Sequence, residues 1–126
     1  MQTNRTYKGD KGDDLSRRLL DFAVHIIRLV QALPNTPVGK HIGGQVLRSG
    51  TSPGSNYEEA RGAESRADFV HKLGIVLKEL KETRFWLRVA SLALVLDSPR
   101  VEPILNECEE LCAIMAKSIL TAKNRK

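Results

Sequence analysis

Apolar residues recur every three to four positions along most of this chain, in four stretches separated by proline, glycine or asparagine. That spacing places the apolar side chains on one face of an α-helix, whereas a half-buried strand would alternate every second residue. The stretches cover residues 15–33, 38–49, 69–94 and 101–119, and no run alternates with period two. Four amphipathic helices with short connectors predict an all-α, antiparallel up-down-up-down four-helix bundle.

Residues that start and stop helices bound the first two stretches. Asp13 or Asp14 can cap the first helix by accepting hydrogen bonds from its first amides, and Pro34 ends it. Thr36 then offers a capping hydroxyl in front of Pro37, whose missing amide proton costs nothing at the first helical position.

The second helix contains residues that oppose its continuation. Gly50, Pro53 and Gly54 predict a kink or a break, with a short further helical piece over residues 57–62. Ser65 caps the third helix, which we expect to run to about residue 96. The predicted bundle therefore has a kinked second helix and one long third helix.

The chain length fits one domain. With 126 residues it can bury a core without disulfides or metal, and 41% hydrophobic with 28% charged residues is typical of a soluble globular protein. We expect a flexible tail over residues 1–12, the bundle over 13–122 and a basic tail over 123–126. The polar start and the short, interrupted apolar runs favour a cytoplasmic protein that does not span a membrane.

The end of the third helix carries more apolar surface than one bundle face needs. Residues 85–96 contain a single charge, Arg88, and Phe85, Trp86, Val89 and Ala93 lie off the core stripe. Soluble monomers rarely expose such a patch, so we interpret these residues as a subunit interface. The alternative is that the fourth helix and the N-terminal arm cover them within one chain.

A polar cluster surrounds the interrupted part of the second helix. It comprises Ser52, Asn56 and Glu59, with Glu79 further along the third helix. One interpretation is a binding site for a ligand or partner. The interpretation that we favour is structural: the short polar side chains satisfy backbone groups freed at the break, while a glutamate pairs with Arg48 or Arg61.

The chain is basic, with a formal charge of +5 and a sequence pI near 9.5. A basic surface can bind phosphates with salt-sensitive affinity, so RNA or DNA is a candidate partner. Alternatively the charges are ordinary helix surface, with Lys78 and Lys81 pairing with Glu79 and Glu82 along one helix. The candidate nucleic-acid-binding residues are Arg17, Arg18, Arg28, Lys40, Arg48, Arg61, Arg66 and Lys72.

No pattern of residues indicates catalysis or metal binding. Cys108 and Cys112 lie four residues apart on one helical face, a spacing that matches no common zinc motif, and we interpret them as small core residues. His25, His41 and His71 are scattered, and no nucleophile motif accompanies them. We therefore expect a non-enzymatic protein without cofactor or metal.

Several of these residues together resemble a known family. The chain is similar to the bacterial four helix bundle proteins encoded within intervening sequences of large-subunit ribosomal RNA genes, which are related to accessory proteins of diversity-generating retroelements. The resemblance covers residues 15–120 and is carried by Arg48, Ser52, Ser55-Asn56, Glu59, Phe69 and the Leu77-x-Glu79-Leu80 step. The family's usual Ser-Ile-Pro-x-Asn-Ile-Ala-Glu-Gly reads here Ser52-Pro53-Gly54-Ser55-Asn56-Tyr57-Glu58-Glu59-Ala60, with the proline one position earlier and alanine in place of the last glycine.

The resemblance implies a homopentameric barrel with a basic surface, and retroelement relatives bind a reverse transcriptase and nucleic acid. It agrees with the surplus apolar face of the third helix. We therefore expect a homo-oligomeric, nucleic-acid- or ribonucleoprotein-associated protein, with a reverse transcriptase as a possible partner. The alternative is a protein-interaction scaffold without nucleic-acid binding, which would use the acidic first half of the fourth helix or the rim of the oligomer.

Overall fold

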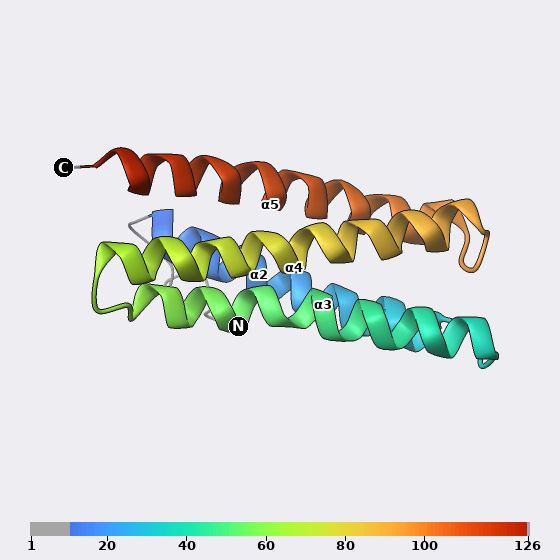
Figure 1. Cartoon of the computed structure of the whole chain (residues 1–126). Helices are drawn as coiled ribbons and strands as arrows, with labels where there is room; N and C mark the ends of the chain where they lie inside the picture. The colour runs from blue at the N-terminus through green and yellow to red at the C-terminus, as the bar shows by residue number, and fades with distance from the viewer. Residues whose placement is uncertain (1–10, 126) are drawn as a thin grey trace, which may run out of the picture.

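The computed structural model describes residues 11–125, which form four α-helices and no strand. The helices lie side by side, and the chain reverses at alternate ends of the molecule (Figure 1). They are α2 (Lys11–Ala32), α3 (Pro37–Arg61), α4 (Arg66–Leu92) and α5 (Ser98–Asn124). α3 packs between α2 and α4, and α5 packs on α4 and, less extensively, on α2. The prediction of an all-α four-helix bundle is confirmed.

The outer helices extend slightly beyond their predicted ends. Lys11 and Gly12 already belong to α2, and the rest of the predicted N-terminal tail lies outside the described residues. At the other end α5 continues to Asn124, into the predicted basic tail. No helix of the described part is long and apolar enough to cross a membrane.

The core is built from the predicted stripes. Each helix contributes side chains at a spacing of three or four residues, and the largest are at most 1% exposed. Burial of aliphatic surface on this scale is the main force that holds such a bundle together. These fully buried side chains are Leu19, Phe22, Ile26, Val46, Leu73, Val76, Leu80, Leu87, Val101, Leu111 and Met115.

α3 is a single helix, so the predicted break around Pro53 does not occur; whether the helix is kinked stays a prediction. Proline lacks the amide proton that would bond to the carbonyl of Ser49 four residues earlier. The hydroxyl of Ser52 donates to that carbonyl at 3.5 Å, and the hydroxyl of Ser55 donates to the carbonyl of Ser52 at 3.1 Å. These side chains compensate for the proline within the helix, which explains why the sequence does not terminate it here.

Gly50 lies in the same helix for a packing reason. A Cβ atom at this position would lie 2.8 Å from Cγ1 of Ile26 on α2, closer than side chains tolerate. Glycine therefore permits α3 to approach α2 closely, and the cost in helix propensity of about 1 kcal/mol is offset by that packing.

α4 ends at Leu92, earlier than the predicted end near residue 96. Leu94 adopts a left-handed conformation with φ of 56°, and the amide of Val95 donates to the carbonyl of Ala90 at 3.0 Å. Together with the bond from Leu94 to Ser91, this is the Schellman pattern that ends helices, usually with glycine at the left-handed position. A leucine there carries no sequence signal, which explains the overestimated length.

Candidate nucleic-acid interface

Most of the predicted nucleic-acid-binding side chains bond to other parts of the bundle. Five of the eight form ion pairs with carboxylates, and a sixth, Arg66, donates to the main-chain carbonyl of Arg125. Of the eight, only Arg28 and Lys40 have neither an ion pair nor a side-chain hydrogen bond with a described residue. The pairs are Arg17–Asp21, Arg18–Glu107 and Glu110, Arg48–Glu79 and Glu82, Arg61–Asp13, and Lys72–Asp68.

Arg18 joins α2 to α5. Its Nη2 lies 2.7 Å from Oε1 of Glu107 and 3.1 Å from Oε1 of Glu110, and its Nε lies 3.1 Å from Oε2 of Glu107. The hydrogen bond to Glu107 is the largest effect on the guanidinium and raises the pKa of Arg18 above its usual value. This arginine therefore fastens two helices and neutralises acidic charge on α5.

Arg48 joins α3 to α4 in the same way. Its Nη1 lies 3.3 Å from Oε1 of Glu79, and its Nη2 bonds to Glu82. The prediction that a glutamate pairs with Arg48 is confirmed. Because both carboxylates turn towards α3, Lys78 and Lys81 have no ion pair with any residue in the described range, so the predicted pairing along α4 is wrong.

The α3–α4 contact beneath this arginine is specific. The hydroxyl of Thr83 lies 2.9 Å from Oγ of Ser49, and both groups are fully buried. Nearer the end of the bundle His41 meets Trp86 edge to face, with ring centroids 5.6 Å apart. Each hydroxyl also bonds to a carbonyl of its own helix, Ser49 to Gln45 and Thr83 to Glu79, so the pair adds a polar contact between the two helices within the core.

The predicted polar cluster does not form one site. Ser52 bonds to the carbonyl of Ser49 in its own helix, while Asn56 and Glu59 make no side-chain hydrogen bond or ion pair with a described residue. Glu79 instead forms an ion pair with Arg48. The structural interpretation is confirmed for Ser52 and Glu79, and the prediction that the four residues form one cluster is wrong.

A basic row that the sequence prediction passed over runs along the solvent side of α4. We call Lys78, Lys81, Phe85 and Arg88 the α4 outer row; they follow one another at three- and four-residue intervals and all four are exposed. That spacing keeps them on one helical face. Arg88 lies 2.9 Å from Glu109 of α5, whereas the two lysines remain unneutralised. The row could have been predicted if Arg48 had been assigned to both neighbouring glutamates, because Lys78 and Lys81 would then have had no carboxylate partner on α4.

The residues of the predicted oligomer interface on α4 differ in exposure. Trp86 and Val89 are half-buried against the core, and Ala93 lies beyond the end of the helix. Phe85, 56% exposed, and Leu92, 86% exposed at the last position of α4, present large apolar side chains to solvent here, and Leu94 just beyond the helix is 78% exposed. α3 supplies part of the cover, through His41 on Trp86.

A second apolar stripe lies on α2. Leu20, Val24 and Ile27 are 52%, 38% and 40% exposed, and Leu47 of α3, also exposed, is 41% accessible. The three α2 residues recur at i, i+4 and i+7, beside the core stripe of the same helix. Their spacing was readable in the sequence, but the predicted apolar face of this helix did not include them.

The cysteines lie in the core, as predicted. Cys108 donates to the carbonyl of Leu80 at 3.3 Å, and no group of three His, Cys, Asp or Glu side chains that could hold a metal occurs within residues 11–125. The contact with Cys108 lowers the pKa of Cys112 to about 7, with Arg84 and Lys81 adding to the effect while burial opposes it. The same contact and burial raise the pKa of Cys108.

Comparison with known proteins identifies the family. Residues 14–117, which reach from the first turns of α2 into the last turns of α5, match the family described as 23S rRNA-intervening sequence protein. The chain belongs to this family. The resemblance of the sequence to rRNA intervening-sequence proteins is thereby confirmed.

A solved structure supports the same assignment to the 23S rRNA-intervening sequence protein family. It is the crystal structure of a protein of unknown function from the S23 ribosomal protein family of Bacteroides thetaiotaomicron, 38% identical to this chain with a TM-score of 0.78. The match covers 83% of this chain and 97% of that one. No match was found among curated proteins.

Proposed function

We propose that this family member is a non-enzymatic nucleic-acid-binding protein that contacts phosphates through the α4 outer row. The supporting observation is the Arg48 pairing with Glu79 and Glu82, which removes both carboxylates from that side of α4. Lys78 and Lys81 then project into solvent without a counter-charge from a described residue. Two unpaired lysines one helical turn apart are a better phosphate surface than eight cations that are mostly occupied in ion pairs.

The row combines the two interactions that nucleic-acid surfaces use. Lysine ammonium groups displace counterions from phosphates, a contribution that does not depend on sequence and weakens with salt. Phe85 lies between Lys81 and Arg88 on the same face and offers its ring for stacking on an unpaired base. The four residues span about 15 Å of helix at 1.5 Å per residue. The row therefore suits a loop or single strand of RNA.

The test is fluorescence anisotropy of labelled structured RNA and duplex DNA across a salt titration. Replacing both Lys78 and Lys81 by Gln should weaken binding about tenfold and lower the slope of log affinity against log salt by about two. The matched control replaces Arg28 and Lys40 by Gln, which removes the same charge from exposed, unpaired positions elsewhere and should change binding much less. Equal losses in both double variants would show that only net charge matters and would reject the α4 outer row.

We also propose that the protein acts as a homo-oligomer, for which the resemblance suggests a pentamer. The exposed stripe of Leu20, Val24 and Ile27 supports a second apolar contact outside the core. Several α4 outer rows in one particle would multiply weak phosphate contacts. Light scattering should give a mass of several chains that Ile27→Glu reduces and Leu120→Glu, at an exposed α5 position, leaves intact. A wild-type mass of one chain would reject the oligomer.

A reverse transcriptase is the protein partner that the resemblance implies, and we propose it on that ground alone. Co-elution of the purified protein with a retroelement reverse transcriptase at physiological salt tests it. Separate elution at micromolar concentrations would remove this partner.

The alternative function is a protein-interaction scaffold that uses the acidic half of α5. That surface is reduced because Glu107 and Glu110 pair with Arg18, while Glu109 pairs with Arg88. The nucleic-acid proposal is therefore favoured. A persistent oligomer that binds neither RNA nor DNA even at low salt would reverse this preference.

A further inference from the structure

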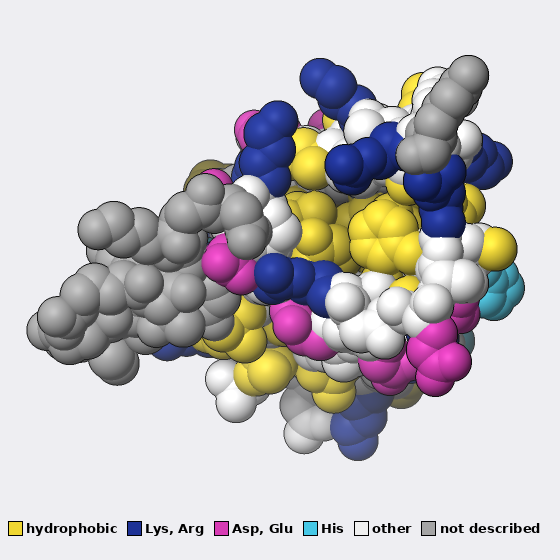
Figure 2. Space-filling model, turned by 90° about the vertical axis from the view of Figure 1, so that its left-hand side faces the viewer, with side chains coloured by type: hydrophobic (Ala, Val, Ile, Leu, Met, Phe, Trp, Pro, Cys, Tyr) yellow, Lys and Arg dark blue, Asp and Glu magenta, His cyan; other side chains and the backbone are white. Residues whose placement is uncertain are grey.

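A cavity opens at the end of the bundle where the last turns of α3 and α5 meet the first turns of α2 and α4. Figure 2 looks onto this end and shows apolar side chains at the centre, with lysine and arginine side chains mainly above and beside them and acidic side chains to the left and below. The cavity encloses about 470 Å³, within the range of small-molecule sites. Its lining residues on α4, Phe69 and Leu73, come before positions 78–88, and no residue of the α4 outer row lines it.

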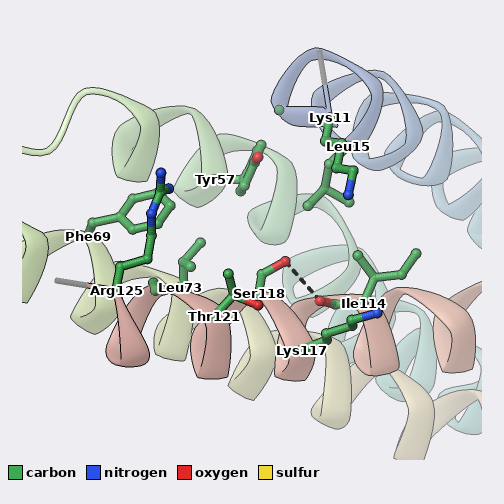
Figure 3. A pocket seen from close by; sticks show the side chains of 12 residues that line it. Lys11, Leu15, Tyr57, Phe69, Leu73, Ile114, Lys117, Ser118, Thr121 and Arg125 are labelled. Carbon is green, nitrogen blue, oxygen red and sulfur yellow. Dashed lines mark hydrogen bonds between the residues drawn. The ribbon is translucent and has the colours of Figure 1, made fainter.

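The floor of the cavity is apolar and comes from all four helices. Leu15, Tyr57, Phe69, Leu73 and Ile114 line it, and Leu73 is fully buried (Figure 3). Side chains from four helices converge here without filling the space between them. An apolar body placed in this space would remove both its own surface and that of the floor from water, which favours binding.

The rim of the cavity carries only positive charge. Lys11, Lys117 and Arg125 line it, and no Asp or Glu is among its described lining residues. All three cations are exposed, and none has an ion pair with a residue in the described range. Figure 3 shows Arg125 beside Phe69 and the two lysines on the side of Leu15 and Ile114.

Two interactions hold this rim in shape. Arg66 at the start of α4 donates to the main-chain carbonyl of Arg125, which ties the end of α5 to α4. The hydroxyl of Ser118 donates to the carbonyl of Ile114 at 2.9 Å, so it is turned into its own helix. The rim therefore presents three cations and no competing carboxylate to anything that enters.

We propose that this cavity binds a small amphipathic carboxylate, with its hydrocarbon body on the apolar floor and its carboxylate among Lys11, Lys117 and Arg125. A neutral apolar ligand would leave the cations unused, and a cationic one would be repelled. A highly charged polar anion would leave the floor exposed to water. The combination of apolar floor and unpaired cationic rim selects a molecule that carries both features.

The experiment uses three probes that share one tail: decanoate, 1-decanol and decylamine. Calorimetric titration of the full-length protein should show saturable binding of decanoate, about tenfold weaker binding of decanol, and weaker binding still of decylamine. Methyl NMR locates the site, because Ile114 and Leu73 should shift while Ile27 on the exposed α2 stripe should not.

Charge variants test the rim without disturbing the core. Lys117→Gln and Arg125→Gln should each weaken decanoate binding by about two- to fivefold and leave decanol binding unchanged. Lys123→Gln is the matched control, since Lys123 is an exposed lysine of the same helix that does not line the cavity. Equal weakening by the control would indicate a net-charge effect and would overturn the proposal.

Three other results would also overturn it. Decanol that binds as tightly as decanoate would mean that the cations do not select the head group. Shifts at Ile27 in place of Ile114 would move binding to the α2 stripe. Nuclear Overhauser contacts from residues 1–10 to the Ile114 methyl in the free protein would mean that the chain's own N-terminal segment occupies the space.

Discussion

The two flanks of α4 differ in whether their charged side chains form ion pairs and whether their aromatic rings pack against another helix. On the flank that faces α3, Glu79 and Glu82 pair with Arg48, and Trp86 meets His41. On the outer row the neighbouring residues Lys78, Lys81 and Phe85 face solvent, and neither lysine pairs with a described carboxylate.

This difference arises because residues that are adjacent in the sequence point in different directions from the helix axis and therefore have different neighbours. A rotation of about 100° per residue sends Phe85 and Trp86, or Lys81 and Glu82, to different surroundings. One flank then contributes to stability, while the other is left with uncompensated charge. We expect mutations on the two flanks to separate folding from binding.

The largest expected effect separates the adjacent aromatic residues. Trp86→Ala should lower the free energy of unfolding by about 2–3 kcal/mol, because it removes a ring packed against the core and His41. Phe85→Ala, at a 56% exposed position, should cost less than about 1 kcal/mol. Urea unfolding followed by circular dichroism measures both, and equal losses would break the distinction between the flanks.

The next effect connects the flanks through Arg48. Arg48→Gln should release Glu79 and Glu82, whose carboxylates then compete with phosphate for the neighbouring lysines, and RNA binding should weaken about fivefold, or about 1 kcal/mol. Adding Glu79→Gln and Glu82→Gln to this variant should restore the affinity.

The triple variant also separates two roles for Arg48. If the arginine itself contacts phosphate, as the sequence interpretation held, neutralising the two glutamates would not recover the loss. Anisotropy at one fixed salt concentration decides between these outcomes.

A smaller effect concerns the stability that the Arg48 pairs contribute. Arg48 is exposed, so Arg48→Gln should lower the free energy of unfolding by less than about 1 kcal/mol. The loss should shrink in 1 M salt, where charges beyond about 3 Å are screened. A salt-independent loss above 2 kcal/mol would mean that the arginine stem packs on the helices and that its charge is secondary.

The smallest effect is on the titration of Cys112, whose pKa is lowered to about 7 by Cys108 and by the Arg84 and Lys81 cations. The folded state therefore releases this proton at lower pH than the unfolded state. The resulting stabilisation is full above the ordinary thiol pKa and is lost as the pH falls through 7. Lys81→Gln should move the pKa of Cys112 upwards.

Thiolate absorbance against pH measures this shift, with Lys123→Gln as the control. Identical titrations in the wild type and Lys81→Gln would mean that the charge of Lys81 does not lower the pKa of Cys112.

Much of the fold was predictable from the sequence because burial follows helical spacing. The core positions of all four helices, the Thr36 and Ser65 caps and the buried cysteines follow from local pattern. The continuity of α3 through Pro53 was not predictable, since it depends on hydroxyl bonds that form only in the helix. The early end of α4 depends on left-handed Leu94, which no composition rule indicates.

The candidate site was less predictable for a related reason. Exposed cations look alike in a sequence, and only the fold shows that Arg18 and Arg48 are occupied while Lys78 and Lys81 are not. Which carboxylate reaches Arg18 or Arg48 depends on contacts across 31 to 92 residues of chain. Family membership, in contrast, was readable from the motif around residues 48–80.

The most direct test of the account is lysine acetylation of the protein with and without bound RNA, read by mass spectrometry. It reports which ammonium groups are covered by phosphate and needs no mutation. We predict that RNA protects Lys78 and Lys81 and leaves Lys40 and Lys123 equally reactive in both states. Protection of Lys40 without protection of Lys78 and Lys81 in an RNA-bound sample would contradict the assignment of the α4 outer row.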